Sequence, residues 1–368
     1  MFGSGIQLTL LIGTSVPASA PTALMEALES VEITSSDNGP AGFQMHFHAD
    51  REEGLPDDFQ MFSSPLLAAG SRVVISVTMQ GAPTVLMDGL INTHGSGAST
   101  ITVTGEDISV AMDLVEVSMD YPMMEPMEIV QLVLLRYAAF GVVPEIIPPL
   151  NGGGALPLDA VPQQNTTDRG YVRQLAASMG NHFFIRPGPV PLMNQAYWGP
   201  PICTGVPQKT LTVDMGPNTN VESIQFQYQP LSTDPVYDTV QDTQILMDQP
   251  VLTPGSTRMP PPARPAAREQ NSLFQDPRLG TIDTVAKAQS QTNGSPDRVV
   301  TVQGEVDVLR YGSILQAARL VAVRGAGPSY DGLYMVQSVT HKLNRGSYHQ
   351  SFTLNREGLE STIFTAPP

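Results

Sequence analysis

Apolar and polar residues alternate along three runs near the end of the chain, at 319–324, 330–341 and 347–359. Alternation with a period of two is typical of β-strands that bury one face. Two glycine-containing segments, 325–329 and 344–347, separate the runs and supply the residues that tight turns favour. The pattern therefore predicts a meander of three antiparallel strands.

The same order of runs occurs once earlier in the chain, at 72–77, 86–94 and 101–108. A shift of 247 positions, from 72 to 319, places Arg72 on Arg319 and His94 on His341. The same shift also matches Val74 with Val321, Leu86 with Leu333 and Thr93 with Thr340. The hairpin that follows is four residues longer in the second copy, and beyond it Thr102 matches Thr353 and Glu106 matches Glu357. The agreement predicts two copies of one β-module in a single polypeptide.

Strand patterns fill the first part of the chain, at 6–12, 31–34, 41–48, 59–67, 72–77, 85–92 and 100–104. Six or seven strands in about 105 residues is the spacing of a β-barrel or β-sandwich. We therefore expect the first β-module to span 1–106, with a short helical turn at 21–28.

The periodicity becomes helical after Glu106. It predicts helices at 107–115, 125–140 and 167–179, followed by a hairpin formed by 182–187 and 194–199. The clearest helix has Pro126 and Glu128 in its first turn and ends at Gly141. These elements predict an α/β domain, 107–206, inserted between the β-modules.

Strand patterns return at 209–214, 221–229, 238–246 and 297–305, ahead of the final meander. The second β-module is therefore expected to combine 207–246 with 296–368. Five prolines between positions 254 and 265 exclude a helix or a sheet interior there. We interpret 247–295 as an extended connector with a weak helix at 281–292.

Charge is distributed unevenly along the chain, which has a formal net charge of −16. Residues 1–168 contain 20 acidic and 3 basic residues, whereas residues 169–368 contain 15 and 16. An acidic chain without a basic stripe is a poor candidate for binding nucleic acid directly. No run approaches the roughly 20 apolar residues of a membrane span, so membrane binding is not expected either.

The N-terminus resembles a signal peptide in having Leu8–Ile12 followed by Ala18–Ala20. No Lys or Arg precedes Arg51, however, so the positive region of a signal is missing and we expect this segment in the mature protein. The single Cys203 excludes an internal disulfide and is typical of a protein made in a reducing compartment.

Few residues have the spacing of a catalytic or metal site. His46 and His48 stand two apart on one predicted strand, as in some zinc sites, but no third ligand accompanies them. His94 and His341 occupy matched positions in the repeat, which favours structural roles. The chain also lacks a Gly-x-Ser-x-Gly motif, a phosphate-binding loop and a Gly-x-Gly-x-x-Gly after a strand. We therefore expect no enzyme activity, no cofactor and no metal.

The phrases at 331–341 and 348–359 resemble the C-terminal signature of baseplate hub proteins of contractile phage tails and related injection systems, the late-control-D-like family. Further phrases that resemble this family are found at 87–89, 104–107, 196–201 and 215–223. The resemblance implies a mainly β fold with an α+β insertion: two tube-like antiparallel β-barrel modules related by internal duplication, plus an inserted α/β domain.

The resemblance also implies a homotrimeric structural hub that adapts the hexameric inner tube to a trimeric spike. Its implied partners are the spike protein, inner tube or tube-initiator proteins and other baseplate proteins, with assembly in the bacterial cytoplasm as part of a phage tail-like particle. The chain ends soon after the second module, so the spike is expected to be a separate protein. Two similar modules in each of three chains would place six similar units in a ring, which suits such an adaptor.

Two other classes remain as alternatives. A carbohydrate- or protein-binding β-sandwich would need exposed aromatic residues, but the chain has only one Trp and 6% aromatics. A hydrolase would need a nucleophile and a base, and no such motif is present.

Two groups of residues are candidate interaction sites. Asp88, Glu106 and Asp107 are candidates to line a central channel, and an ordinary solvated surface is the alternative; no spacing singles out an acid–base pair among the acidic residues. Arg258, Arg264 and Arg268 are candidates for an arm, 254–268, that packs on a partner or a neighbouring subunit, and a disordered loop is the alternative. The subunit contacts are expected to exceed ~2,000 Å² and to use the apolar strands 73–77 and 320–323.

Overall fold

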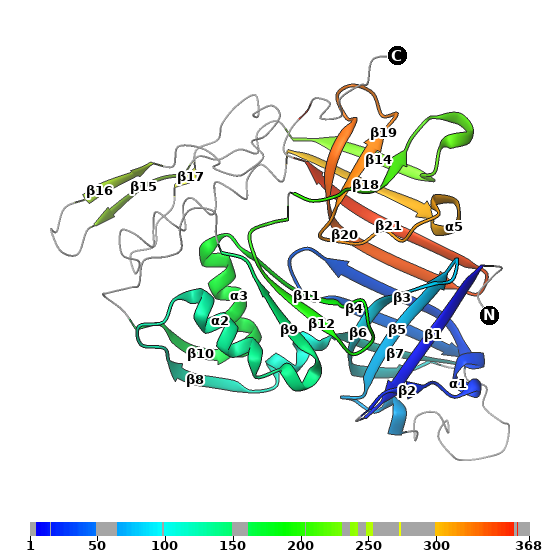
Figure 1. Ribbon diagram of the computed structural model, residues 1–368, viewed down its shortest axis with the longest axis horizontal. Helices are drawn as coiled ribbons and strands as arrows, with labels where there is room; N and C mark the ends of the chain where they lie inside the picture. The colour runs from blue at the N-terminus through cyan, green and yellow to red at the C-terminus, as the bar shows by residue number, and fades with distance from the viewer. Residues whose placement is uncertain are drawn as a thin grey trace.

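The computed structural model of the protein describes residues 5–14, 16–48, 65–97, 99–148, 161–202, 204–229, 236–241, 248–252, 272–273, 299–356 and 359. Most of the predicted connector, including its helix at 281–292, lies outside these residues. The described chain is mainly β, as predicted (Figure 1).

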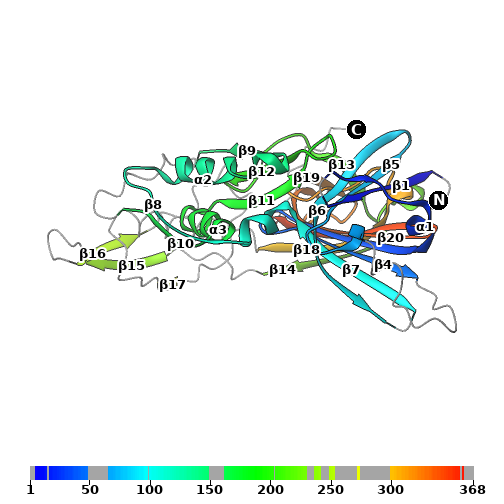
Figure 2. The same cartoon turned by 90° about the horizontal axis from the view of Figure 1, so that it is seen from below.

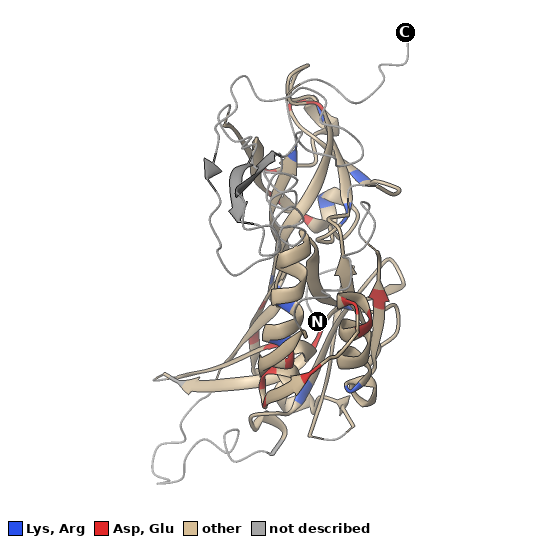
Figure 3. Ribbon diagram, turned by 90° about the vertical axis from the view of Figure 1, so that its left-hand side faces the viewer, with Lys and Arg blue, Asp and Glu red and all other residues tan. Residues whose placement is uncertain are grey.

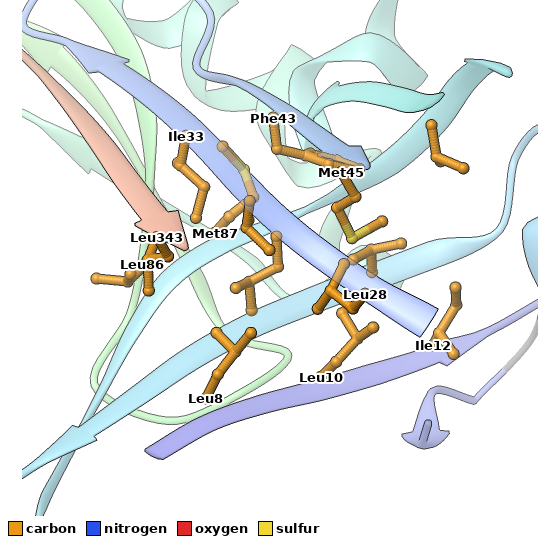
Figure 4. Close-up of a cluster of buried hydrophobic side chains, with 14 of the residues drawn as sticks. Leu8, Leu10, Ile12, Leu28, Ile33, Phe43, Met45, Leu86, Met87 and Leu343 are labelled. Carbon is orange, nitrogen blue, oxygen red and sulfur yellow. The ribbon is translucent and has the colours of Figure 1, made fainter. Parts of the chain in front are cut away.

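Six long strands form what we call the first module: β1 (Ile6–Gly13), β3 (Leu28–Ser36), β4 (Gly42–His48), β5 (Arg72–Met79), β6 (Ala82–Ser96) and β7 (Thr100–Asp107). Its short elements are β2 (Ala18–Ser19), α1 (Thr22–Ala27) and a 3-10 helix, Pro65–Leu67. Buried and solvent-facing residues alternate along β4 and β7, because successive side chains of a strand point to opposite faces. The buried faces meet in one core, where Leu28, Ile33 and Met45 are fully enclosed (Figure 4).

The second module also has six strands: β13 (Gln208–Thr212), β14 (Ser223–Tyr228), β18 (Val300–Asp307), β19 (Leu320–Arg324), β20 (Gly332–Asn344) and β21 (Ser347–Arg356). A 3-10 helix, Gly216–Asn218, and a short helix, α5 (Val308–Tyr311), complete it. Its strands enclose a separate core that includes Val302, Tyr334 and Leu354. The predicted three-strand meander corresponds to β19, β20 and β21.

The two modules repeat the same strand order. The first runs β3-β4-β7-β6-β5-β1 across its sheet, and the second runs β14-β18-β21-β20-β19-β13. Each strand has its counterpart at the same place in chain order, so β3 corresponds to β14 and β6 to β20. The pairing direction also agrees throughout except at one end, where β1 is antiparallel to β5 but β13 is parallel to β19.

The segment between the modules folds around a third hydrophobic core. Its strands and helices are β8 (Glu116–Asp120), α2 (Pro126–Leu135), β9 (Val142–Ile146), β10 (Gln163–Thr167), α3 (Asp168–Met179), β11 (His182–Pro187) and β12 (Asn194–Gly199), with 3-10 helices at Ile108–Asp113 and Ala138–Phe140. Figures 1 and 2 place this region beside the first module, with α2 and α3 near the three-stranded sheet β11-β12-β9. The predicted domain bounds themselves stay a prediction.

The helices α2 and α3 start where the sequence indicates. A capping box joins Glu125 and Glu128 around Pro126 at the start of α2. The Thr167 hydroxyl accepts a hydrogen bond from the Gly170 backbone N–H at the start of α3. The predicted helix at 107–115 is instead a shorter 3-10 helix, and the helix predicted to run to 140 ends as α2 at Leu135.

Three further strands, β15 (Val236–Gln241), β16 (Asp248–Leu252) and β17 (Ser272–Leu273), form a separate small sheet. Among the helices that the structure describes, none has the length and apolar character needed to cross a membrane. Figure 3 shows acidic positions gathered in the half of the ribbon that carries the N-terminus, which follows the uneven charge of the sequence.

Candidate assembly interfaces

The two modules are joined by backbone pairing within a single sheet. One edge of β20 pairs with β21, and its other edge is divided between two strands. The first part of β20 pairs with β19, whereas residues Ser338–Asn344 pair with Ser36–Ser30 of β3 in the first module. A continuous sheet therefore runs through both modules (Figure 1).

Side chains reinforce this joint on the core side. Leu343 and Tyr348 of the second module belong to the core of the first module (Figure 4 shows Leu343 beside it). The Arg345 side chain, at the tip of the β20–β21 hairpin, donates hydrogen bonds to the backbone carbonyls of Leu28 (Nε to O, 3.1 Å) and Glu26. The hairpin tip is thus anchored in the neighbouring module.

A buried histidine lies in the same joint. The Tyr348 hydroxyl is 2.7 Å from Nδ1 of His341, and Nε2 of Gln350 is 3.2 Å from the same atom. The Gln350 amide also donates to the Leu315 carbonyl oxygen (2.8 Å) and accepts from the Leu315 N–H (2.9 Å). Burial lowers the pKa of His341 to about 4, so the imidazole is neutral near pH 7 and Nδ1 acts as the hydrogen-bond acceptor.

β6 and β14, the strands that correspond to β20 and β3 of the joint, have other neighbours. β5 pairs with β6 as far as Leu90, and the loop before β5 bonds Ile91. β14 pairs with β18 on one side and with no described strand on the other, so it ends the described sheet.

β-Bulges fix which residues of the modules correspond. The β6–β7 register shifts at Asn92, and the β20–β21 register shifts at Gln337. Just before each bulge, one residue has its backbone N–H bonded to the loop that precedes the first meander strand. These bonds are Ile91 N to Ser71 O and Val336 N to Arg319 O, both 2.9 Å. The agreement places Asn92 on Gln337.

This correspondence corrects the residue matches drawn from the sequence. Arg319 corresponds to Ser71 and not to Arg72, and His94 corresponds to Val339 and not to His341. The sequence shift failed because the β5–β6 hairpin is three residues longer than the β19–β20 hairpin. Arg72 pairs with Leu90, 18 residues later, whereas Leu320 pairs with Met335, 15 residues later. The two histidines differ accordingly, since His341 is buried and His94 is exposed.

Residues at the joint are less exposed than the residues at the corresponding positions of β6 and β14. Val339 of β20 is fully buried, whereas its counterpart His94 is exposed. Ile33 of β3 has 0% exposure, whereas its counterpart Phe226 on β14 is half-buried. The positions that the joint covers in one place are uncovered in the other.

The face of the sheet opposite the cores is polar across both modules, and hydroxyl and amide groups predominate on it: Thr34, Gln44, Thr102, Thr104, Gln303, Thr340, Ser351 and Thr353. The hydroxyls of Thr34 and Thr340 lie 3.1 Å apart across the module joint. Charged groups on this face include Lys342 and Glu305, which form an exposed ion pair of 3.4 Å.

Asp88 forms a buried clamp between the first module and the inserted region. Its carboxylate accepts hydrogen bonds from Arg72 Nε (2.7 Å), Arg72 Nη2 (2.8 Å) and Asn194 Nδ2 (3.1 Å). Arg72 Nη2 also donates to the carbonyl oxygens of Phe140 (2.9 Å) and Leu192 (3.3 Å). The Asp88 side chain has 0% exposure, so its charge is compensated entirely inside the protein.

Close backbone contact accompanies this clamp at Gly141. Its φ is +77°, and a Cβ atom there would lie 1.9 Å from the carbonyl oxygen of Leu192. Only glycine fits, because an L-residue would meet both the strained φ and this contact.

Asp107 and Glu106 have different surroundings. Asp107 is buried and accepts hydrogen bonds from the backbone N–H groups of Ala41 (2.5 Å) and Ser109 (2.8 Å), although burial raises its pKa. Glu106 Oε2 lies 2.6 Å from Arg169 Nη1, and Arg169 also pairs with Asp113. Of the three channel-lining candidates, only Glu106 is thus partly exposed, with 34% of its side chain accessible. The channel-lining role stays a prediction.

The remaining predicted sites are the three arginines of the connector and the two histidines of β4. Arg258, Arg264 and Arg268 lie outside the described residues, so the partner arm also stays a prediction. His46 is 3.1 Å from the Thr102 hydroxyl and His48 is 3.3 Å from Glu29. Within the described ranges, no three His, Cys, Asp or Glu side chains gather as a metal-ligand set.

No family model matches the chain, and no curated protein sequence matches it either. Solved structures do match. A tail protein from Neisseria meningitidis MC58 is similar with a TM-score of 0.64 and 14% identity, over 97% of this chain and 98% of that one. The 43 kDa tail protein of prophage MuSo2 from Shewanella oneidensis gives 0.61 and 13%, over 95% and 98%.

A third similar structure is the E. coli c3393 protein, described as a component of the type VI secretion system with structural similarity to T4 tail proteins gp27 and gp5. Its TM-score is 0.56 at 12% identity, over 92% of this chain and 77% of that one. At such identities the likeness concerns the fold. It extends over nearly the whole chain, including the inserted region.

Proposed function

We propose that this protein is a structural baseplate hub of a phage tail or a contractile injection system. Three copies close into a pseudo-sixfold ring that adapts a hexameric inner tube to a trimeric spike. The observation that carries the proposal is the repeat of one six-strand order in two modules of a single sheet. Similar structures that include a tail protein, a prophage tail protein and a type VI secretion component support it.

The repeat matters because of symmetry. A ring of three chains with two similar modules each presents six similar surfaces toward a hexamer, while its true symmetry remains threefold toward a trimer. A chain with one module would match only one of the two partners. The proposed partners are a spike protein, inner tube or tube-initiator proteins and other baseplate proteins. The proposed place of assembly is the bacterial cytoplasm.

The polar face of the sheet is the proposed wall of the central channel. The opposite face packs on the cores of both modules. In a closed ring the outer circumference is longer than the inner one. The side that carries the bulky cores is therefore placed outside, and the polar face inside. Hydroxyl and amide groups offer a passing cargo no apolar patch and few fixed charges. Of the acidic candidates, Glu106 is the one whose partly exposed carboxylate fits the rim of such a wall.

The protein acts in this proposal as a scaffold and not as an enzyme. No observation favours the alternative of a carbohydrate-binding sandwich, which would need an exposed aromatic platform. The single tryptophan, Trp198, is fully buried in the inserted region.

Light scattering on the purified chain tests the ring. One chain has a mass of 39.4 kDa, so the expected oligomer has a mass of three times this value, about 118 kDa. Each subunit contact is expected to bury more than ~2,000 Å², which favours an oligomer that persists on dilution. A stable monomer or dimer, alone and together with the spike protein of the same particle, would contradict the proposal.

A further inference from the structure

We propose that β8 of the inserted region binds a basic β-strand of a different protein, which pairs with the edge of β8 that no described strand occupies. The bound strand carries two basic residues four positions apart, with apolar residues at the alternate positions between them. The inference goes beyond the ring. It rests on the proposed function only in placing the partner in the same baseplate.

The sheet formed by β8 and β10 contains only these two strands. Figures 1 and 2 place it at the outer side of the inserted region, away from the second module. Four of the five residues of β8 are exposed. A strand at the edge of a sheet presents its N–H and C=O groups to any chain that can pair with it. This sheet is therefore accessible to a further strand.

The backbone groups of β8 alternate between its two sides. The Tyr121 N–H donates to the Pro162 carbonyl oxygen on the β10 side (2.9 Å). Backbone groups of alternate residues in an antiparallel strand point the same way, so those of every second residue before Tyr121 also face β10. Those of Glu116, Ser118 and Asp120 point outward, and no described group bonds them. The outward groups can pair with a third strand.

One face of β8 is acidic. Glu116, Ser118 and Asp120 share this face, because alternate side chains of a strand point the same way. The Ser118 hydroxyl on this face donates to Oδ1 of Asn165 on β10 (2.8 Å). Both carboxylates belong to exposed residues, and neither forms an ion pair within the described chain. Two uncompensated negative charges thus flank the centre of the edge.

The other face of β8 is apolar and partly uncovered. Met119 Sδ lies 3.5 Å from Nη2 of Arg136, which shows that this face is turned toward α2. Met119 is nevertheless 42% exposed, and Leu114 and Val115 just before the strand are 73% and 67% exposed. Exposed apolar side chains that gather at one place mark an interaction site.

The two faces determine the chemistry of the bound strand. Residues opposite one another in an antiparallel pair share a face. Every second side chain of the bound strand therefore lies beside Glu116, Ser118 and Asp120, and the others lie beside Val117 and Met119. Charge complementarity requires basic residues at the two ends of the first group, and the second group is apolar. The sequence Lys-Val-Thr-Val-Lys meets both requirements.

A second copy of this chain does not fit the edge. Two β8 edges in antiparallel register would place Glu116 of one copy opposite Asp120 of the other, and like charges opposite each other destabilise a sheet. Among the described strands, only β11 has basic side chains four residues apart, His182 and Arg186, and both already contact carboxylates of this chain. The partner is therefore a different protein.

A cyclic hairpin peptide with one strand reading Lys-Val-Thr-Val-Lys is the probe, because its strand is preorganised for pairing. Its fluorescence anisotropy is measured during titration with the full-length protein. We expect binding that added salt weakens. A hairpin of the same composition reading Val-Lys-Thr-Lys-Val is expected to bind about tenfold more weakly, because its lysines face Val117 and Met119. Equal affinity of the two hairpins would overturn the pairing.

Ser118→Pro locates the contact on the outer edge of β8. The substitution removes an outward N–H and none of the bonds to β10, so we expect it to abolish binding. Ser118→Ala is the matched control, because it loses only the hydroxyl bond to Asn165 and should bind as the wild type does. Unchanged binding to a folded Ser118→Pro protein would overturn the edge contact.

Charge reversal tests the same contact without proline. Glu116→Lys combined with Asp120→Lys is expected to weaken binding of the basic hairpin by about tenfold or more, and to create binding of a hairpin reading Glu-Val-Thr-Val-Glu. Failure of the acidic hairpin to bind this variant would count against the inference.

The mass of each protein is measured in parallel. A wild-type trimer that binds neither lysine hairpin would overturn the strand contact and leave the hub function standing. A monomer that binds the basic hairpin in preference to its control would support the contact and contradict the hub function.

Discussion

Replacing Asp88 by alanine is expected to reduce the free energy of unfolding by about 3–5 kcal/mol, the usual cost of removing one partner from a buried ion pair. The carboxylate compensates the Arg72 guanidinium and accepts a hydrogen bond from Asn194, and its side chain has 0% exposure. Without it, the guanidinium stays largely buried with only carbonyl partners. The clamp between the first module and the inserted region then opens.

Urea titration of the purified protein, followed by tryptophan fluorescence, measures this effect. Trp198 reports on the inserted region that the clamp holds. The matched control is Lys342→Ala, which removes an exposed ion pair and is expected to cost less than about 1 kcal/mol. Equal effects of Asp88→Ala and Lys342→Ala would contradict the assignment of Asp88 as the clamp.

The stability of the second module is expected to fall as the pH decreases from 6.5 to 4 because of His341. Burial lowers the pKa of the folded histidine to about 4, against 6.5 in the unfolded chain. The unfolded state therefore binds the proton more readily. The stabilising contribution is complete above pH 6.5 and is lost toward pH 4, with a total of about 3 kcal/mol.

His341→Asn isolates this contribution, because the amide occupies the place of Nδ1 and its oxygen accepts from the Tyr348 hydroxyl. The variant should lose less stability than the wild type between pH 6.5 and 4. His94→Asn, at an exposed position, controls for the loss of a histidine as such. Parallel pH profiles of wild type and His341→Asn would show that His341 is not buried as a neutral group.

Local patterns predicted the elements of this chain well. Alternation identified the strands of both modules, and Thr167, Pro126 and Glu128 marked the helix starts because caps depend on neighbouring residues. The strands β8, β9 and β10 were missed. β8 pairs with β10 more than 40 residues away and exposes most of its side chains, so its sequence has no regular alternation.

The joint between the modules had no signal in the sequence at all. The β20–β3 pairing links residues about 300 positions apart, and such contacts are selected by the edges that remain once each module has folded. The role of Asp88 was missed for a related reason. An aspartate that pairs with an arginine sixteen residues earlier looks like any solvated acid until the strands place both beside Asn194.

Hairpin lengths explain the error in the repeat alignment. The first hairpin of the meander is three residues longer in the first copy and the second hairpin is four residues longer in the second copy, so a constant sequence shift cannot follow both. The histidines at 94 and 341 happened to agree under the constant shift. The hydrogen bonds at Ile91 and Val336 show the structural correspondence instead.

Electron microscopy of the purified oligomer, viewed down its axis, tests the central claim most directly. The hub account predicts a closed ring with six similar lobes around a central channel. Three inserted regions, one for each chain, should lie outside it at threefold positions. A closed ring that contains two or six chains, or an open filament, would contradict the account.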